Sequence, residues 1–201
     1  MKNLLIILLL IIFYVEASAQ YTQNPYGDFT RKKIYNYITG ELFLNSPAGR
    51  DESQSISAIR YTVCFTNGKY HQFGIGSGIV SHTAAADTAR VNYIGIPIYI
   101  SNRFYFTDPE LRQTCLYLEC HGGYHLPISG TYQSGNREGQ PVPAFLPKGT
   151  GFFGFTFGAR IPLVNNTAFI MEFIYRDQHV PYPGKENFYP HFVGLGCGVS
   201  F

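Results

Sequence analysis

The stretch that decides the fold runs from residue 113 to residue 128 and reads QTCLYLECHGGYHLPI. Successive side chains of a β-strand point to opposite faces, so a strand with one apolar face alternates with a period of two. The even positions are mostly apolar: Leu116, Leu118, Cys120, Gly122, Tyr124, Leu126 and Ile128. The odd positions are mostly polar: Gln113, Cys115, Tyr117, Glu119, His121, Gly123 and His125. The alternation predicts one long amphipathic strand over residues 112–128.

Seven further segments alternate in the same way. They are residues 33–45, 55–66, 69–82, 91–106, 151–164, 167–179 and 187–201. At roughly 12 to 16 residues, these segments exceed the ~5 to 6 residues of most soluble strands and reach the ~9 to 11 that a tilted membrane strand needs. The pattern therefore predicts an all-β fold, an eight-stranded antiparallel up-and-down transmembrane β-barrel.

The N-terminus reads as an export signal. Lys2 is followed by an apolar run from Leu4 to Val15, and Ala17 and Ala19 form a small-x-small cleavage motif. This run is shorter than the ~20 residues of a membrane-spanning helix, although a retained signal anchor is the alternative. The predicted organisation is a signal peptide over 1–19, a periplasmic segment over 20–32 and the barrel over 33–201.

The composition agrees with export to a membrane. Aromatic residues make up 16% of the chain and charged residues only 14%, against about 25% charged in soluble domains. No second apolar run is long enough for a helical span, and the net charge of +2 gives no reason to expect nucleic acid. We expect a monomer in the cell outer membrane. Four cysteines, Cys64, Cys115, Cys120 and Cys197, fall on both faces of predicted strands, where they serve as small apolar fillers rather than disulfides.

The connections between the segments are expected to alternate in length. Short turns are expected at 67–68, 107–110 and 165–166, and longer loops at 46–54, 83–90, 129–150 and 178–186. Outer-membrane barrels have short periplasmic turns and long outer loops, so this order is the one expected with the N-terminus in the periplasm. Asn67-Gly68 is a strong hairpin signal. The loop over 129–150 is the main candidate for a binding element, with an unstructured surface cap as the alternative.

Charged side chains gather on the parity that faces inward. The polar residues assigned to the interior are Glu41, Arg60, Arg103, Glu119, His121, Arg160, Glu172 and Arg176. An eight-stranded barrel is just wide enough for side chains to fill it, and an unpaired charge inside is costly. We therefore expect an interlocked network of arginine–carboxylate bonds that plugs the barrel, with ion or proton passage as the alternative. The inward glycines that leave room for these side chains are Gly74, Gly76, Gly78, Gly194, Gly196 and Gly198.

No spacing in the sequence specifies an enzyme, a metal site or a cofactor. Glu119, His121 and His125 share a face, but the two histidines lie about 13 Å apart along a strand and cannot hold one ion. The side chains that could meet at the outer rim are His82, Asp177 and His179, with Ser81 or Ser134. Because neither set has a specific spacing, we expect no catalysis, no metal and no cofactor.

Several of these segments resemble a known family. The runs over residues 68–78, 96–100 and 103–106 are similar to strands of small Bacteroidetes-type outer-membrane β-barrel proteins, and so is the ending over residues 194–201. The resemblance covers nearly all of the mature chain and implies an eight-stranded membrane barrel, generally without an assigned substrate. The four cysteines and the loop over 129–150 depart from that pattern.

The last strand ends on an aromatic residue. Its outward positions are Val193, Leu195, Cys197, Val199 and Phe201, a series that resembles the C-terminal signal read by the barrel-assembly machinery. We expect this strand to pair with residues 33–45. Other expected partners are outer-membrane lipid and lipopolysaccharide, with aromatic belts that include Tyr61, Tyr124, Tyr175 and Tyr189.

The expected role is structural or in surface interactions. Two alternatives remain: a soluble lipocalin-like barrel that binds a small hydrophobic ligand, and an outer-membrane lipid-modifying enzyme. The lipocalin-like barrel requires the apolar face to point inward, so the placement of the charged residues distinguishes it from a membrane barrel.

Overall fold

The computed structural model describes residues 34–45, 53–86, 89–109, 113–134, 149–163, 167–178 and 191–201. The chain divides into two units, 1–32 and 33–201, and the described residues all belong to the second. The predicted signal peptide, with Ala17 and Ala19, and the predicted periplasmic segment lie outside the described residues. Within the described part of the chain, no helix is long and apolar enough to cross a membrane.

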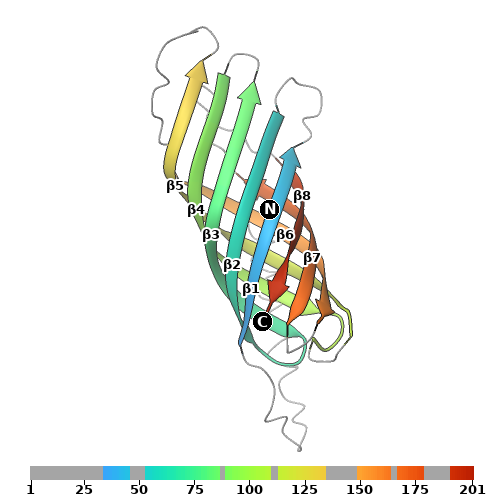
Figure 1. Ribbon diagram of the computed structural model, residues 1–201. Helices are drawn as coiled ribbons and strands as arrows, with labels where there is room; N and C mark the ends of the chain where they lie inside the picture. The colour runs from blue at the N-terminus through green and yellow to red at the C-terminus, as the bar shows by residue number, and fades with distance from the viewer. Residues whose placement is uncertain are drawn as a thin grey trace, which may run out of the picture. The chain divides into compact units, whose positions relative to one another are not determined.

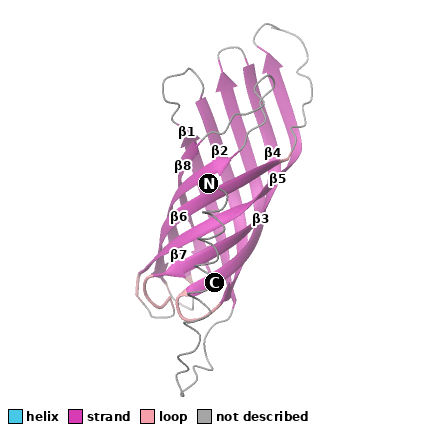
Figure 2. Ribbon diagram, turned by 180° about the vertical axis from the view of Figure 1, so that it is seen from behind, coloured by secondary structure: helices cyan, strands magenta, loops and turns pink. Residues whose placement is uncertain are grey.

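Eight antiparallel strands form a closed barrel (Figures 1 and 2). They are β1 (Ile34–Asn45), β2 (Ser53–Thr66), β3 (His71–Ala86), β4 (Ala89–Tyr105), β5 (Cys115–Ser134), β6 (Thr150–Pro162), β7 (Ala168–Gln178) and β8 (His191–Ser200). Each strand pairs with the next in sequence, and β1 pairs with β8 from Tyr37↔Ser200 to Leu44↔Val193. The predicted up-and-down barrel, and its closure between the first and last strands, are confirmed.

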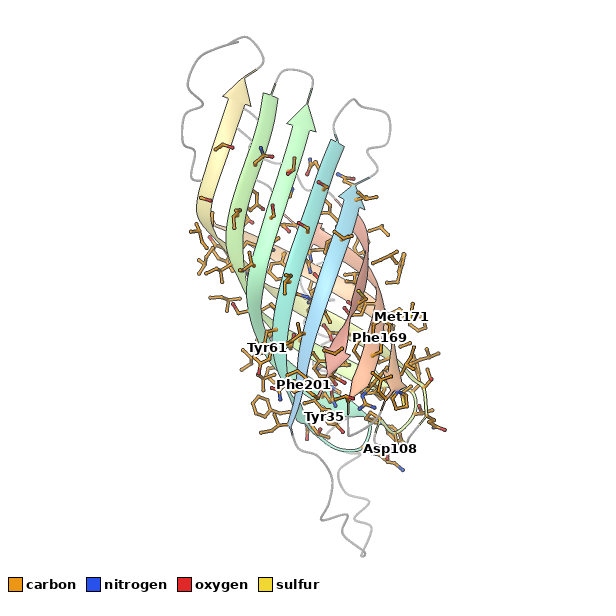
Figure 3. The ribbon with its side chains drawn as sticks, viewed as in Figure 1. Tyr35, Tyr61, Asp108, Phe169, Met171 and Phe201 are labelled. Atoms are coloured by element: carbon orange, nitrogen blue, oxygen red, sulfur yellow. The ribbon has the colours of Figure 1, made fainter. Side chains whose placement is uncertain are left out.

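The outer surface of the barrel is apolar and the inner surface carries the charges. On β1, for example, Leu42 and Leu44 are 68% and 71% exposed, whereas the intervening Phe43 is 1% exposed. Figure 3 shows Phe169 and Met171 on the outer side of β7. The predicted parity therefore holds on all eight strands. A soluble barrel with an apolar interior needs the opposite arrangement.

Two clusters of buried apolar side chains occupy different levels of the interior. One consists of Tyr35, Tyr37, Cys64, Tyr105, Cys115, Tyr117 and Ile170. The other consists of Phe43, Ile56, Ala58, Val80, Tyr93, Ile174 and Phe192. Along β1, Glu41 lies between the two clusters, and along β2 Arg60 does the same. Glu41, Arg60 and Glu172 thus lie between the two apolar clusters, whereas Arg176 lies beyond Ile174 of the second cluster along β7, and Arg160 is paired with Cys115 and Ile170 of the first.

The connections differ from the predicted ones on both ends of the barrel. At the turn end, where the chain also ends, β2–β3 and β6–β7 are joined by residues 67–70 and 163–167, but β4–β5 needs residues 106–114 rather than 107–110. At the opposite, loop end, β3 and β4 are separated only by residues 87 and 88, so the predicted loop over 83–90 is wrong. The run of small alanines hid the strand, because alanine gives no apolar–polar alternation. Within the predicted Asn67-Gly68 turn, Gly68 has a positive φ of 81°. Hairpin turns favour glycine because it adopts this conformation readily.

The predicted loop over 129–150 is also too long. Strand β5 continues to Ser134, and β6 begins at Thr150. The register between β4 and β5 shifts at Ile94/Gly95, because Ser129 pairs with Ile94 while Pro127 pairs with Gly95. Ile128 is the extra residue of a β-bulge, and beyond it the odd positions Ser129 and Thr131 are exposed. This change of phase ended the alternation in the sequence before the strand itself ended.

The four cysteines are unpaired in this structure and lie on both faces, two inside and two outside. Cys64 and Cys115 are buried in the interior. Cys120 and Cys197 lie on the outer surface of β5 and β8, where they contribute small apolar side chains.

Phe201 completes the seam between the first and last strands (Figure 3). Its backbone N–H donates to the carbonyl of Asn36, and its carbonyl accepts from the N–H of Asn36, both at 3.0 Å. Its ring is 44% exposed on the outer surface. The residue therefore contributes two backbone hydrogen bonds to barrel closure in addition to its side chain.

We predict that deleting Phe201 destabilises the refolded barrel by about 2 kcal/mol through the loss of these two bonds. The Phe201→Ala variant keeps the backbone bonds and serves as the control. Urea unfolding in lipid vesicles, followed by the gel mobility of folded and unfolded protein, measures the difference. Equal unfolding midpoints for the deletion and the alanine variant would contradict the role of the backbone bonds.

Candidate functional site

The structure places all eight residues of the predicted polar network on the inner face. Their exposed fractions range from 1% to 5%, and they come from β1, β2, β4, β5, β6 and β7. His125, which shares their face, is also buried. Amphipathic alternation fixes this placement, because each residue has the parity opposite to the outward apolar residues of its strand.

Six of these residues form one chain of alternating charge across the interior. In order, the chain is Arg176, Glu41, Arg60, Glu172, Arg103 and Glu119. Arg176 Nη2 lies 2.8 Å from Glu41 Oε2, and Arg103 Nη2 lies 2.5 Å from Glu119 Oε2. Arg60 contacts Glu41 directly. Three guanidinium groups and three carboxylates balance, so the buried network has no net charge.

Glu172 joins the two halves of the chain. Its Oε2 lies 3.6 Å from Arg60 Nη2, and its Oε1 lies 3.5 Å from Arg103 Nη2. Both contacts cross the barrel interior from β7 to strands that are not its neighbours in the sheet. The hydroxyl of Tyr117 also donates to Oε1 at 2.8 Å. Because burial removes water from all of these groups, such cross-barrel contacts offset part of the lost hydration.

Aromatic rings flank the guanidinium groups. Arg103 lies between the rings of Tyr37 and Tyr117, at 4.1 and 4.3 Å from their centroids. Arg176 lies 4.2 Å from the centroid of Phe43. Desolvated cation–π contacts of this kind contribute ~2 kcal/mol each. The rings therefore stabilise the arginine faces that carry no hydrogen-bond donors.

Arg160 departs from the prediction. Within the described residues its Nη1 donates to the backbone carbonyl of Pro109 at 2.7 Å, and none of the three network glutamates is its partner. Pro109 and the buried Asp108 belong to the connection between β4 and β5 at the turn end (Figure 3). The thiol of Cys115 points to the Asp108 carbonyl, at 3.3 Å. Arg160 thus anchors this connection against the barrel instead of joining the charge network.

Four inward glycines each accept an aromatic or imidazole ring from the residue paired with them on a neighbouring strand. The pairs are Gly76 with Tyr99, Gly158 with Tyr117, Gly154 with His121 and Gly194 with Phe43. In each pair, a Cβ added to the glycine would overlap the ring. An aromatic ring that lies over a glycine of the neighbouring strand packs the space that a side chain would otherwise fill.

Two of these rings reach past the glycine to the strand beyond it. The hydroxyl of Tyr99 crosses Gly76 on β3 and meets Thr62 Oγ1 on β2 at 2.5 Å. The hydroxyl of Tyr117 crosses Gly158 on β6 and meets Glu172 on β7. At the predicted inward glycines Gly78 and Gly198, an added Cβ would meet the backbone of the neighbouring strand rather than a ring. These two glycines therefore allow a close approach of two backbones.

The candidate catalytic residues do not converge. Ser81 is exposed on the outer face and His82 is buried on the inner face, while Asp177 lies on the outer side near His191, with 3.8 Å between Oδ1 and Nδ1. His179 lies outside the described residues. Glu119 and His121 approach each other, with 3.6 Å between Oε1 and Nδ1. No group of three or more potential metal ligands occurs among the residues that the structure describes.

The residues missed by sequence reasoning are the uncharged partners of the network. Tyr37, Tyr99 and Tyr117 have the same parity as the charged residues of their strands, and that parity was the available signal. Their contacts follow from the strand register, which pairs Tyr99 with Gly76 and Tyr117 with Gly158. Of the predicted belt residues, Tyr61, Tyr124 and Tyr175 are exposed on the outer face, and Tyr189 lies outside the described residues.

Comparison with known proteins identifies the fold. No family model and no curated protein matches the chain. Among solved structures, Neisserial surface protein A aligns with a TM-score of 0.52 at 14% identity, over 83% of this chain and 95% of that one. The outer membrane protein OprG from Pseudomonas aeruginosa aligns with a TM-score of 0.52 at 12% identity, over 85% and 97%. The chain has the fold of an eight-stranded outer-membrane barrel. At these identities the likeness concerns the fold alone.

Removing one charge from this network is predicted to lower the free energy of unfolding strongly. In the Arg103→Leu variant, Glu119 and Glu172 lose a partner while they remain buried, and we expect a loss of about 3 to 5 kcal/mol in unfolding free energy. The double variant Arg103→Leu with Glu119→Leu should recover part of that loss, with a coupling of about 1 to 3 kcal/mol. Urea unfolding in vesicles, followed by far-UV circular dichroism, tests both. Strictly additive effects of the two substitutions would contradict the pairing.

The ring-over-glycine packing is tested at Gly76. We predict that Gly76→Ala displaces the Tyr99 ring and destabilises the barrel by about 1 to 3 kcal/mol, as overpacking does. Gly40→Ala is the matched control, because the nearest neighbouring atom to a Cβ at this outward glycine is 3.9 Å away. Both substitutions restrict the unfolded chain equally, so the difference between their unfolding midpoints reports packing alone. Equal midpoints would contradict the overlap with Tyr99.

Proposed function

We propose that the protein is an integral outer-membrane β-barrel whose packed interior does not conduct, with a structural or surface-interaction role. The observation that supports the proposal is that the placement of side chains is the reverse of that in a soluble protein. Large apolar residues cover the outside, and a charge-balanced network lies within. A soluble protein rarely exposes so extensive an apolar surface, whereas lipid tails stabilise one.

The height of the apolar surface supports this placement. On β4 the outward residues between Asn102 and Asn92 are four isoleucines, Ile94, Ile96, Ile98 and Ile100. At ~3.4 Å per residue this interval spans about 34 Å along the strand, and at a tilt of ~45° it covers about 24 Å of membrane. Transmembrane barrels have an apolar band about 25 Å tall. Polar side chains therefore bound an apolar surface of the height that a bilayer requires.

The orientation follows from the two ends. The hairpin turn over residues 67–70 and the C-terminus lie at the turn end of the barrel. In this proposal the turn end faces the periplasm and the loop end faces the cell exterior. On the last strand the outward positions Val193, Leu195, Cys197, Val199 and Phe201 are all exposed. This exposed series supports recognition by the barrel-assembly machinery, as its resemblance to the assembly signal implies.

A closed interior is the form that the side-chain arrangement favours. A solute would have to pass the apolar layer around Phe43 and Phe192, the charge network, and the apolar layer around Tyr37 and Tyr105. Passage through the network would separate buried ion pairs, at a cost of several kcal/mol for each group left unpaired. We therefore propose a plug rather than a pore. The proposal assigns no enzymatic activity, since the candidate residues lie on opposite faces.

The refolded protein in planar lipid bilayers provides the test. We predict no reproducible conductance steps under an applied voltage, because the network and both apolar layers obstruct the interior. The Arg103→Leu/Glu172→Leu variant removes one charge of each sign from the network and measures whether a weakened plug admits ions. Regular single-channel steps from the wild-type protein would contradict the proposal.

A further inference from the structure

Two buried histidines of the interior take no part in the ion-pair network. His82 on β3 is 0% exposed, and His125 on β5 is 1% exposed. Among the described residues, no ring nitrogen of either side chain has a hydrogen-bond partner. A neutral imidazole carries one donor and one acceptor, so packing rather than polar contact holds these rings. Both are titratable groups that the proposed plug does not use.

His82 packs against the second apolar cluster, which lies toward the loop end. Its ring centroid lies 4.8 Å from that of Tyr93 on β4 and 5.9 Å from that of Phe192 on β8. On β2 it is paired with Ile56 of the same cluster. Tyr93 is the titratable group among these neighbours, and its hydroxyl accepts a hydrogen bond from Gln178 on β7. Within the described part of the chain, an imidazolium at His82 would therefore meet rings and alkyl groups but no carboxylate.

His125 lies close to a cation. Its ring centroid is 4.4 Å from that of Phe152, and the centroid of Phe152 is 5.2 Å from the guanidinium carbon of Arg176. The charged or titratable groups that act electrostatically on His125 are Arg176 and His82, and both are cations when protonated. Its strand partners on β4 and β6 carry no charge: Pro97 and Thr150. A proton on His125 would thus face like charges instead of a counter-ion.

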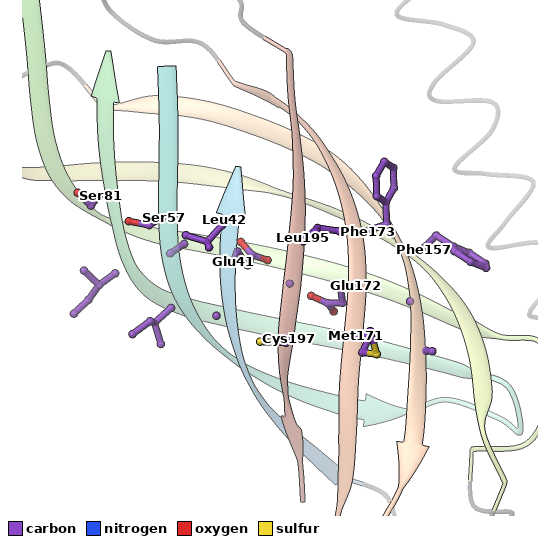
Figure 4. A pocket seen from close by; sticks show the side chains of 17 residues that line it. Glu41, Leu42, Ser57, Ser81, Phe157, Met171, Glu172, Phe173, Leu195 and Cys197 are labelled. Atoms are coloured by element: carbon purple, nitrogen blue, oxygen red, sulfur yellow. The ribbon is translucent and has the colours of Figure 1, made fainter. Parts of the chain in front are cut away.

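The interior carboxylates are held by the arginines. Glu41 on β1 and Glu172 on β7 (Figure 4) both contact arginines of the network. Glu119 pairs with Arg103, and its Oε1 lies 3.6 Å from the Nδ1 of His121. A proton on His121 would therefore meet a carboxylate, which the other two buried histidines lack among the described residues.

We propose that His82 and His125 make the loop-end half of the interior an acid-sensitive closure, which their protonation opens to water while the turn-end half stays packed. Among the described residues, the turn-end apolar cluster contains no histidine, and Arg160 holds the β4–β5 connection there. Charge added by acid therefore acts on one end of the barrel. The inference rests on the proposed function in one respect, that the interior is closed at neutral pH.

The direction of the pH dependence follows from where protons bind. Histidines of the unfolded chain titrate near pH ~6.5. The packed barrel offers an added proton neither water nor a carboxylate at His82 and His125, so the unfolded chain binds more protons below that pH. Stability is therefore greatest above about pH 6.5 and falls as the pH decreases. Between pH 7.5 and pH 5, each histidine that stays neutral in the barrel lowers the folding equilibrium constant about 30-fold.

The first test compares stability at pH 7.5 and pH 5, by urea unfolding of the refolded barrel in lipid vesicles. His82→Phe/His125→Phe keeps two aromatic rings that take no proton, and His191→Phe is the control at a histidine whose side chain is 64% exposed. We expect acidification to lower the folding equilibrium constant of wild type and control at least about 100-fold more than that of the double variant. Equal losses in all three proteins would overturn the inference. Each single variant, expected to remove about 30-fold of the loss, decides the matter if the double variant does not refold.

The second test locates the opening by solvent exchange of arginine Nε–H protons, followed by NMR. Arg176 lies beside Phe152 toward the loop end, and Arg103 lies between the two tyrosine rings toward the turn end. We expect the exchange rate of Arg176 relative to Arg103 to rise at least about tenfold from pH 7.5 to pH 5 in wild type, but not in the double variant. An unchanged ratio despite lost stability would show that acid loosens the whole barrel, and it would overturn a closure at the loop end. Rapid exchange of both arginines at pH 7.5 would instead contradict the closed interior of the proposed function.

Discussion

The alternating ion pairs across the interior are the constraint on which the rest of the structure depends. Three carboxylates and three guanidinium groups lie out of contact with water, so each must meet an opposite charge. The pairing links β7 to β1, β1 to β2, β2 to β7, β7 to β4 and β4 to β5. A slip of one residue in any of these strands would turn its charge to the outer surface and its apolar residues inward. The network therefore favours the observed register of the five strands that contribute to it, β1, β2, β4, β5 and β7.

Room for this network comes from glycines beside the charged residues. Glu172 is paired with Gly158 on one side and with Gly196 on the other, so Arg60 and Arg103 can approach its carboxylate from across the barrel. The same glycines accept rings, as Gly158 accepts Tyr117. Interior volume is thus divided between long side chains on some strands and bare backbone on their neighbours. The outer surface instead carries mainly large, exposed apolar side chains.

Much of the fold was readable from alternation, because a barrel with an apolar exterior imposes a period of two on every strand. That period located eight strands, their inward faces and the charged residues within. It failed where alternation itself fails, at the alanines that end β3 and at the bulge formed by Ile128. The pairing order within the network and the separate role of Arg160 depend on register and tilt between strands. A single sequence does not specify these.

Solvent exchange of the arginine side chains measures the central claim most directly. In the refolded barrel, solution NMR can follow the Nε–H protons of Arg60, Arg103 and Arg176, all at most 2% exposed. Burial inside the barrel predicts separate resonances that exchange with water orders of magnitude more slowly than a free guanidinium group does. Exchange as fast as that of a solvated arginine would show that water reaches the network, and it would contradict a closed, charge-paired interior.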